Sequence, residues 1–217
     1  MDNQSEWKVV SKNRKGKKKN NGNFIKNKIV KVDKPENINN VVVNNKLENK
    51  NINIDIADKV ILPCKYVLWC HDIFNKDWNL NAYTKLCTIS TVSCFWKLFN
   101  NLDKIGYKTN NFFFMKEDTD PIWEHPNNRD GGICSFRSDI DSALKVYEDL
   151  CINMVCEKLF NNMDDINGIS ISPKNNWAII KIWNKNKNND LAELLQKDLK
   201  VKYNNLSIKY KANEPEF

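Results

Sequence analysis

Hydrophobic and polar positions follow two different periods in the chain after about residue 60. Short runs with a period of two are typical of strands with one buried face, and longer runs with a period between three and four are typical of amphipathic helices. The pattern predicts strands at residues 66–70, 111–115, 169–171, 177–183 and 206–211, and helices at residues 91–102, 142–160 and 190–199.

Capping and turn residues support these boundaries. Ser90 or Thr91 can cap the first helix and Asp190 the third, because their side-chain oxygens accept hydrogen bonds from free backbone N–H groups. Asn175 and Asn176 are typical turn residues, so we expect a hairpin around them. Four leucines of the third helix are expected to face inward: Leu191, Leu194, Leu195 and Leu199. Strands interleaved with three helices predict an α+β fold, an antiparallel sheet with helices on one face.

The first 58 residues differ in composition from the rest. They are rich in lysine and asparagine, poor in aromatic residues and without lasting periodicity. Such a segment buries too little apolar surface to offset its ordering entropy, so we predict a disordered tail at 1–58 and a folded domain at 59–217. The basic cluster at 12–19 is consistent with contact to the RNA backbone, with a nuclear localisation signal, or simply with a solvated tail.

Composition and charge narrow the class of protein. The chain of 217 residues carries a formal net charge of +7, which favours polyanionic partners. Seven cysteines occur without any C-x-x-C pair, so we expect reduced core cysteines and neither disulfides nor a metal site. The polar start and the lack of long apolar runs predict a soluble, cytoplasmic monomer with no membrane association and no cofactor. The excess of asparagine, lysine and isoleucine is typical of an AT-rich genome, such as that of a protist or a large virus infecting one.

Two tryptophans lie in segments with loop character. Trp78 sits in a polar stretch, and Trp123 lies between Pro121 and Pro126, which exclude regular structure. Two indoles on loops either pack against the domain or sandwich a ligand. Glu124 presents two oxygens that match the adjacent N1–H and N2–H donors of guanine. A positively charged 7-methylguanine between two indole faces would gain about 0.5–2 kcal/mol per face from cation–π attraction. The three residues are a candidate site for that base.

The hairpin supplies candidate phosphate ligands. Its second strand has a uniformly apolar set of even positions, Ala178, Ile180 and Ile182, which we expect to pack on helices. Lys181 and Trp183 then face the opposite, ligand side. Lys174, just before the turn, can join Lys181 as a phosphate cradle, although both lysines are also compatible with ordinary solvated charges.

The first helix carries a second candidate surface. Val92 and Trp96 are spaced i, i+4 and lie off the apolar stripe of that helix. The stripe itself consists of Phe95, Leu98, Phe99 and Leu102. An aliphatic and an aromatic residue side by side on an outward edge indicate a partner site, or else a helix with an unusually wide buried face.

The sequence does not favour an enzyme. It contains no glycine-rich phosphate loop, no H-x-E metal pattern and no evident Ser/His/Asp set. A cysteine beside His71 and Asp72 does not establish a catalytic dyad, because such neighbours arise by chance in a cysteine-rich core. We therefore expect a binding protein with no catalytic residues.

Several motifs resemble the eukaryotic initiation factor 4E family, the messenger RNA cap-binding proteins, in the right order over about residues 62–211. The matching segments are Lys76-Asp77-Trp78, Thr91-Val92-Ser93-Cys94-Phe95-Trp96, Pro121-Ile122-Trp123-Glu124, Gly131-Gly132 and Ile182-Trp183-Asn184-Lys185. The resemblance implies a curved antiparallel sheet of about eight strands backed by three helices, with a cap-binding slot on the concave face. It also implies that Trp78 and Trp123 sandwich the methylated base, that Glu124 pairs with its Watson–Crick edge, and that Trp183 contacts the methyl group.

The resemblance also implies a partner site on the opposite, dorsal face. There Val92, Trp96 and Val155 would bind the helical motif of a scaffold like initiation factor 4G, or of a binding protein that carries a similar motif. The expected function is therefore to bind capped messenger RNA and to recruit a scaffold, promoting cap-dependent translation initiation. The alternative is a cap-binding repressor or competitor of the same fold.

The chain is a divergent member by this resemblance. Lys174 stands where the family usually has Arg, and Ile179 where it usually has Lys. Lys181 lies two residues further on the same face, so we expect it to substitute as the phosphate ligand.

Overall fold

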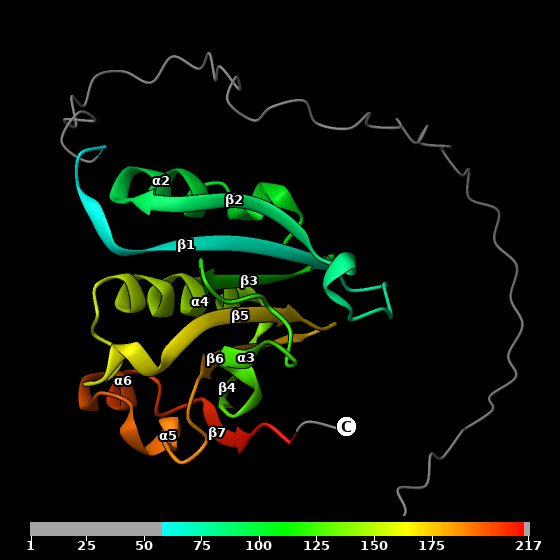
Figure 1. Cartoon of the computed structure of the whole chain (residues 1–217). Coiled ribbons are helices and arrows are strands. Elements are labelled where there is room, and N and C mark those ends of the chain that lie inside the picture. The colour runs from blue at the N-terminus through cyan, green and yellow to red at the C-terminus, as the bar shows by residue number, and fades with distance from the viewer. Residues whose placement is uncertain (1–57, 215–217) are drawn as a thin grey trace, which may run out of the picture. The chain divides into compact units, whose positions relative to one another are not determined.

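The computed structural model of the protein describes residues 58–214, so nearly all of the tail predicted at 1–58 lies outside the described residues and its disorder stays a prediction. Within that range seven strands form one antiparallel sheet with the order β2-β1-β3-β5-β6-β4-β7. Figure 1 shows this order from β2 at the top to β7 at the bottom. The strands are β1 (Ile61–Asp72), β2 (Thr84–Thr91), β3 (Asn110–Lys116), β4 (Gly132–Asp139), β5 (Ile166–Pro173), β6 (Trp177–Asn184) and β7 (Ser207–Ala212).

The α+β class and the antiparallel sheet are confirmed, with seven strands in the described residues where about eight were expected. The helices are α2 (Val92–Phe99), α3 (Pro126–Arg129), α4 (Ile140–Val155), α5 (Leu191–Leu194) and α6 (Lys197–Lys202). Thr91 rather than Ser90 caps α2, because its side chain accepts a hydrogen bond from the Cys94 N–H at 3.2 Å. The predicted hairpin joins β5 to β6.

The third predicted helix is split into α5 and α6. Leu195 and Gln196 have extended backbone, which resets the helical phase, and the Gln196 N–H is bonded to the Leu159 carbonyl at 3.1 Å instead of continuing a helix. As a result Leu194 is 52% exposed, and the prediction that it faces inward was wrong. The other three leucines are buried as predicted: Leu191, Leu195 and Leu199.

Alternation in β3 gives the sheet two apolar faces. Phe112 and Phe114 join the large core between sheet and helices, whereas Phe113 and Met115 join a smaller cluster on the other face. The smaller cluster also contains Trp183. A run of apolar residues in a central strand is typical of a sheet that is covered on both faces. One face of this sheet is covered by helices, and the other forms the floor of a cavity.

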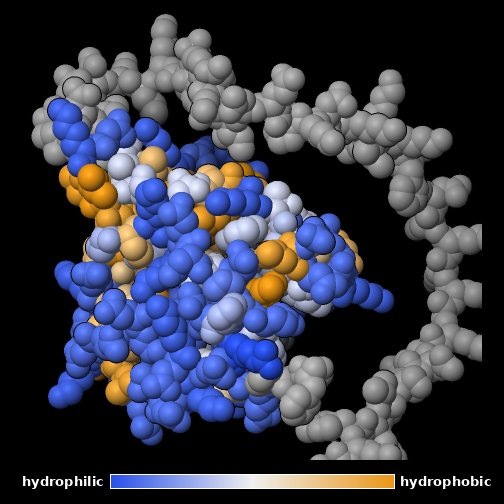
Figure 2. Space-filling model, viewed as in Figure 1, coloured by the Kyte–Doolittle hydropathy of each residue, from blue (hydrophilic) through white to orange (hydrophobic). Residues whose placement is uncertain are grey.

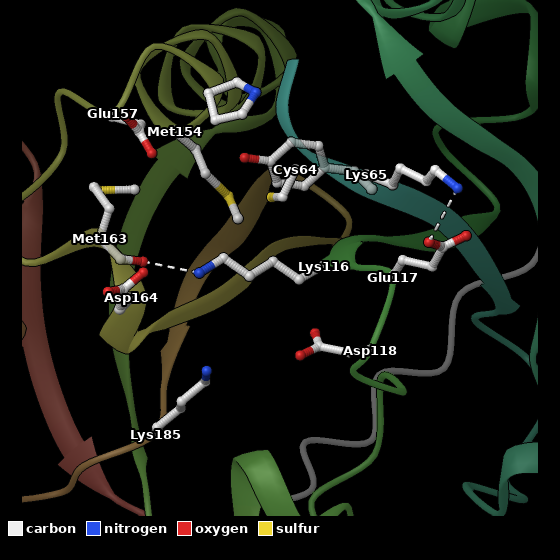
Figure 3. Close-up of a pocket in the computed structure, with 12 residues that line it drawn as sticks. Cys64, Lys65, Lys116, Glu117, Asp118, Met154, Glu157, Met163, Asp164 and Lys185 are labelled. Carbon is white, nitrogen blue, oxygen red and sulfur yellow. Dashed lines mark hydrogen bonds and ion pairs between the residues drawn. The ribbon is translucent and has the colours of Figure 1, made fainter. Parts of the chain in front are cut away.

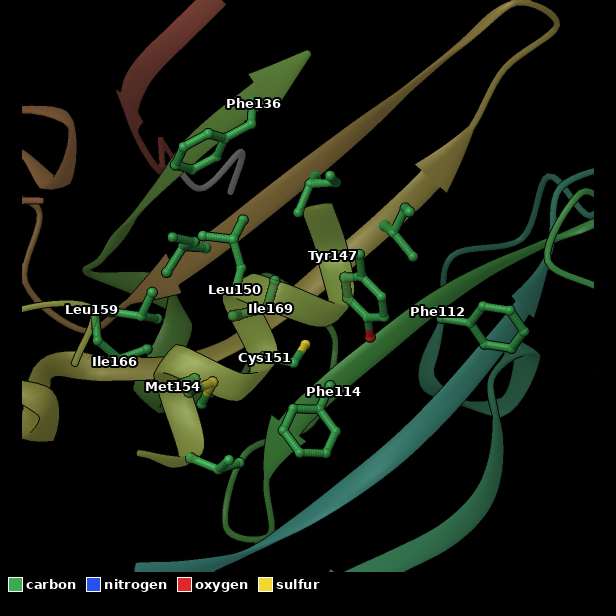
Figure 4. Close-up of a cluster of buried hydrophobic side chains, with 14 of the residues drawn as sticks. Phe112, Phe114, Phe136, Tyr147, Leu150, Cys151, Met154, Leu159, Ile166 and Ile169 are labelled. Carbon is green, nitrogen blue, oxygen red and sulfur yellow. The ribbon is translucent and has the colours of Figure 1, made fainter. Parts of the chain in front are cut away.

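Helix α4 covers the sheet centre. Its buried side chains recur every three to four residues and point toward β3 and β5, as Figure 4 shows. They include Ala143, Tyr147, Leu150, Cys151 and Met154. The Asp139 carboxylate caps the helix by accepting from the Ser142 N–H at 3.0 Å, so the helix starts before the predicted residue 142. It ends at Val155, five residues before the predicted end, because Glu157 adopts a left-handed φ of 57°.

The seven cysteines are all free, as expected. Cys134 and Cys151 are buried, and burial raises the pKa of the Cys134 thiol to about 12, which keeps it protonated and unreactive. Cys156 is exposed, so not every cysteine belongs to the core. Among residues 58–214 no helix is long and apolar enough to cross a membrane.

Candidate functional site

A cavity of about 380 Å³ opens on the sheet face that α4 does not cover. Five residues singled out from the sequence meet there: Trp78, Trp123, Glu124, Lys181 and Trp183. The remaining lining residues are Tyr83, Phe113, Ile122, Ser170 and Ser172. The cavity therefore combines aromatic walls, one carboxylate and one ammonium group, contributed by two loops and three strands.

Trp78 lies in the loop between β1 and β2 and is 54% exposed. Three side chains of this loop accept hydrogen bonds from backbone N–H groups two residues ahead, which gives the loop a defined shape. The His71 ring stacks on the Trp78 indole, with centroids 4.2 Å apart and an angle of 10° between the planes. His71 Nε2 also donates to the Asp77 carbonyl at 2.7 Å. His71 thus occupies one indole face and does not line the cavity, so the other face is available to a ligand.

Trp123 lies in the loop between β3 and α3 and is 45% exposed. This loop rests on the fully buried Asn128, whose amide donates to the carbonyls of Asp120 at 2.9 Å and Ile122 at 2.7 Å. The Asn167 amide in turn donates to the Asn128 side-chain oxygen at 2.9 Å. The position of the second indole is therefore fixed by an amide network that reaches from the loop to β5.

The two glycines after α3 are required by close packing. A Cβ atom at Gly131 would lie 1.7 Å from the Asn184 carbonyl oxygen, and a Cβ at Gly132 would lie 2.1 Å from the Tyr210 hydroxyl. The Gly132 N–H donates to the Asn184 side chain at 2.8 Å. This close approach joins the segment between α3 and β4 to the end of β6.

Glu124 provides the negative charge of the cavity. Tyr83 lies beside it, and burial first, then the Glu124 charge, raises the pKa of the Tyr83 hydroxyl well above its usual value. Glu124 makes no hydrogen bond or ion pair with other residues of the described range 58–214. Its two oxygens are therefore free to accept hydrogen bonds from a ligand.

Lys181 provides the positive charge on β6. Burial, and secondarily the charge of Lys174, lowers the pKa of the Lys181 ammonium group. A partly desolvated cation without a carboxylate partner is destabilising, and an anionic ligand group would relieve that cost. Ala178, Ile180 and Ile182 are fully buried on the opposite face, so the predicted alternation of β6 is confirmed.

Lys174 does not line this cavity. It lies in the hairpin turn, where its N–H is bonded to the Trp177 carbonyl at 2.7 Å, and it lines a separate hollow with Phe74 and Lys108. In this structure Lys174 does not line the cavity with Lys181, although its charge acts on Lys181, so the cradle of the two lysines stays a prediction. The turn follows Ser172, the last cavity residue of β5, and so carries Lys174 beyond the rim.

Trp183 forms the floor with Phe113. It is buried, and its Nε1 donates to the Ser170 hydroxyl at 3.0 Å, which leaves no free polar group on the indole. Sequence reasoning missed the supporting residues His71, Tyr83 and Ser170. His71 lies two residues after Trp69 in β1, so the strand period could have placed both side chains on the same face of the sheet. No feature of the sequence predicted that His71 stacks on Trp78.

A second, larger hollow of about 640 Å³ lies at the beginning of β1 and the end of α4 (Figure 3). Its charged groups partly satisfy one another. Lys116 donates to the Met163 carbonyl at 2.9 Å, and Lys65 points to Glu117 at 3.8 Å. Carboxylates are numerous there, so the hollow does not favour an anionic ligand. Within residues 58–214 no group of three or more His, Cys, Asp or Glu side chains is placed to hold a metal ion.

The predicted partner residues divide in their exposure. Trp96 is 40% exposed and Val92 is partly exposed, whereas Val155 is only 8% exposed and packs in the core. The Val92 N–H is bonded to the Val60 carbonyl at 3.0 Å, which brings the exposed Val60 and Ile61 beside α2. Figure 2 shows hydrophobic surface at the end of the molecule where β1 begins. The exposed apolar patch is thus Val60, Ile61, Val92 and Trp96, without Val155.

Comparison with known structures identifies the fold. The C. elegans eIF4E-3 in complex with the 4E-binding protein Mextli and cap analog matches with a TM-score of 0.62 at 21% identity, over 70% of this chain and 92% of that chain. Ascaris suum eIF4E-3 with the m7G cap matches with a TM-score of 0.61 at 20% identity, over 73% of this chain and 93% of that chain. At these identities the likeness concerns the fold alone.

Comparison of sequences identifies relatives. The eukaryotic translation initiation factor NCBP of Triticum aestivum is 30% identical over 116 residues, 52% of this chain and 50% of the relative. The eukaryotic translation initiation factor 4E homolog of Acanthamoeba polyphaga mimivirus is 28% identical over 135 residues, 51% of this chain and 50% of the relative. The chain spans about half the length of the curated relatives it matches. The family model for eukaryotic initiation factor 4E matches residues 61–216, most of the chain. This protein therefore belongs to the eukaryotic initiation factor 4E family.

Proposed function

We propose that this protein binds the 7-methylguanosine cap of messenger RNA in the cavity between Trp78 and Trp123. The observation that carries the proposal is the meeting of two half-exposed indoles from separate loops with a free carboxylate, Glu124, in one cavity. Stacking on aromatic side chains contributes about 1–3 kcal/mol per base, and the positive charge of the methylated base adds a cation–π contribution. Selectivity for the methylated base follows from that second contribution.

The remaining contacts follow from the same pose. Glu124 accepts from N1–H and N2–H of guanine, and Trp183 on the floor contacts the methyl group. Lys181 lines the slot and binds the phosphate chain, where the anion stabilises a partly desolvated ammonium group. Lys174 lines another hollow and takes no part in this pose.

A fluorescence titration of the full-length protein with 7-methyl-GTP and with GTP, at fixed salt, tests the proposal. Stacking on Trp78 and Trp123 predicts strong quenching by the methylated nucleotide and at least tenfold weaker binding of GTP, as expected if about 1.4 kcal/mol of cation–π attraction is lost. Equal affinities for both nucleotides would contradict the indole sandwich.

We also infer that the exposed patch of Val60, Ile61, Val92 and Trp96 recruits a scaffold of the initiation factor 4G type, or a binding protein with a similar helical motif. The support is an apolar surface on the helix side of the sheet, remote from the slot. A pull-down with a scaffold peptide is expected to lose binding with Trp96→Ala and to retain it with Leu194→Ala, which removes an exposed apolar side chain on α5. Retention by the Trp96 variant would remove this partner site.

A further inference from the structure

A groove of about 800 Å³ continues from the slot toward the edge strand β7. It shares Trp123, Glu124 and Lys181 with the slot, so the two spaces are contiguous. Its other lining residues are Arg129, Ile133, Ser135, Lys211, Ala212, Asn213 and Glu214. The groove begins at the cation that the proposed cap phosphates would reach and ends at the rim of the sheet.

Lys181 and Lys211 line the groove, and the strand register adds Lys209, which does not line it but lies opposite the lining residue Ser135. Ser135 on β4 lies opposite Lys181 on β6 and opposite Lys209 on β7. Residues that lie opposite each other in antiparallel strands point to the same face, so these three side chains form one row across the sheet. Two strand spacings separate the lysines, about 10 Å. Lys211 lies opposite Ile133 in the next row on the same face.

In the described part of the chain these cations form no ion pair. Within residues 58–214, Lys209, Lys211 and Arg129 take part in none of the ion pairs, which join Lys65 to Glu117, Lys97 to Asp58 and Lys202 to Asp149. Two carboxylates, Glu124 and Glu214, also line the groove, against the three cations Arg129, Lys181 and Lys211. Lysines on an edge strand also prevent pairing of that strand with another chain. That role alone would not explain why the lysines lie beside a groove that is continuous with the slot.

We propose that this groove binds the phosphodiester backbone of the first RNA nucleotides after the cap, an inference that rests on the proposed function of the slot. A positively charged groove that follows the backbone is the usual device for binding single-stranded nucleic acid without sequence preference. Lys181 binds the cap phosphates, and Lys209 and Lys211 bind the phosphates that follow. The β7 edge is therefore the exit for the RNA chain.

The test compares 7-methyl-GTP with capped, unstructured RNAs of one, three and six nucleotides on the full-length protein. We expect affinity to rise with length in the wild type. In the Lys209→Ser/Lys211→Ser variant this gain is lost, whereas 7-methyl-GTP binds as in the wild type. Loss of two phosphate contacts lowers the salt slope for the capped hexanucleotide by about 1.4, roughly sevenfold in affinity between 50 and 200 mM salt. Lys158→Ser/Lys197→Ser, which removes two exposed lysines that do not line the groove, is the control for lost charge.

The outcomes separate the two proposals. If the wild type binds 7-methyl-GTP and the capped hexanucleotide equally, or if the Lys209→Ser/Lys211→Ser variant keeps the gain with length, the groove proposal is overturned and the slot proposal stands. If the control variant loses as much as the Lys209→Ser/Lys211→Ser variant, the effect is one of net charge, and the groove proposal is again overturned. If the wild type does not bind 7-methyl-GTP, the proposed function itself fails.

Discussion

Replacement of Glu124 by Gln is the sharpest perturbation of the proposed base contact. The variant keeps the size of the side chain but replaces one acceptor oxygen by an NH2 donor, which would face a guanine donor. One charge-assisted hydrogen bond is lost, and a donor is left unpaired in a slot closed by two indoles. A hydrogen bond to a charged group contributes about 1.5–3 kcal/mol, so we expect a loss of about 2–3 kcal/mol, roughly 30- to 150-fold in Kd for 7-methyl-GTP.

A second ligand shows whether the hydrogen bond lost in Glu124→Gln is the one to the 2-amino group of guanine. The triphosphate of 7-methylinosine lacks the 2-amino group and keeps the charge, the methyl group and the stacking surface. The wild type is expected to bind it more weakly than 7-methyl-GTP, whereas Glu124→Gln should discriminate less between the two ligands. Isothermal titration calorimetry is the suitable assay, because Glu124 adjoins Trp123 and the variant could change its fluorescence. Glu117→Gln, an exposed carboxylate at the end of β3, is the matched control.

Two results would refute this reasoning. A change of less than twofold for Glu124→Gln would show that the carboxylate does not pair with the base. Equal losses for both ligands would show that Glu124 acts through its charge on the methylated ring, with no bond to the 2-amino group.

Three further variants test the phosphate ligand, the end of α4 and the support of the Trp123 loop. Lys181→Met should raise the melting temperature, because it removes a desolvated charge, and should weaken 7-methyl-GTP more than 7-methylguanosine. Glu157→Gly should stabilise the protein by about 1 kcal/mol, or about 2–4 °C in calorimetry, since it relieves a left-handed residue, whereas Glu148→Gly within α4 should destabilise it. Asn128→Ala should lower both the melting temperature and the affinity for 7-methyl-GTP, unlike the exposed Asn204→Ala.

Each of these variants also has a contradicting result. Equal losses for nucleotide and nucleoside would show that Lys181 is not a phosphate ligand. An unchanged or lower melting temperature for Glu157→Gly would mean that the glutamate side chain stabilises this helix end by more than its backbone strain costs. Unchanged affinity for Asn128→Ala would show that the Trp123 loop keeps its position without the amide network.

Those features that depend on local periodicity were predictable. The alternation in β6 separated the core residues Ile180 and Ile182 from Lys181 and Trp183, and the structure confirms that separation. The same holds for the cap of α2 and for the β5–β6 hairpin. These features are set by neighbours a few residues apart, whose side-chain directions follow from the strand or helix period.

Features that depend on tertiary contacts were not predictable. The break between α5 and α6 follows from the bond between Gln196 and the Leu159 carbonyl, 37 residues away in the chain by their numbers. The end of α4 at Val155 follows from the left-handed conformation of Glu157. The support of Trp78 by His71, and of the Trp123 loop by Asn128, involves side chains with no periodic signal of their own.

The displacement of the cation along β6 connects the slot with the groove. The family usually has a Lys where Ile179 stands, and Lys181 lies two residues further on the same face, about 7 Å along the strand. Ile179 lies opposite Arg137, whereas Lys181 lies opposite Ser135, which lines the groove. The shift therefore moves the charge along β6 from the row that contains Ser207 of β7 into the row that contains Lys209. If Lys181 binds the cap phosphates as proposed, the phosphates that follow would lie beside this row, and the Lys209→Ser/Lys211→Ser variant tests that path.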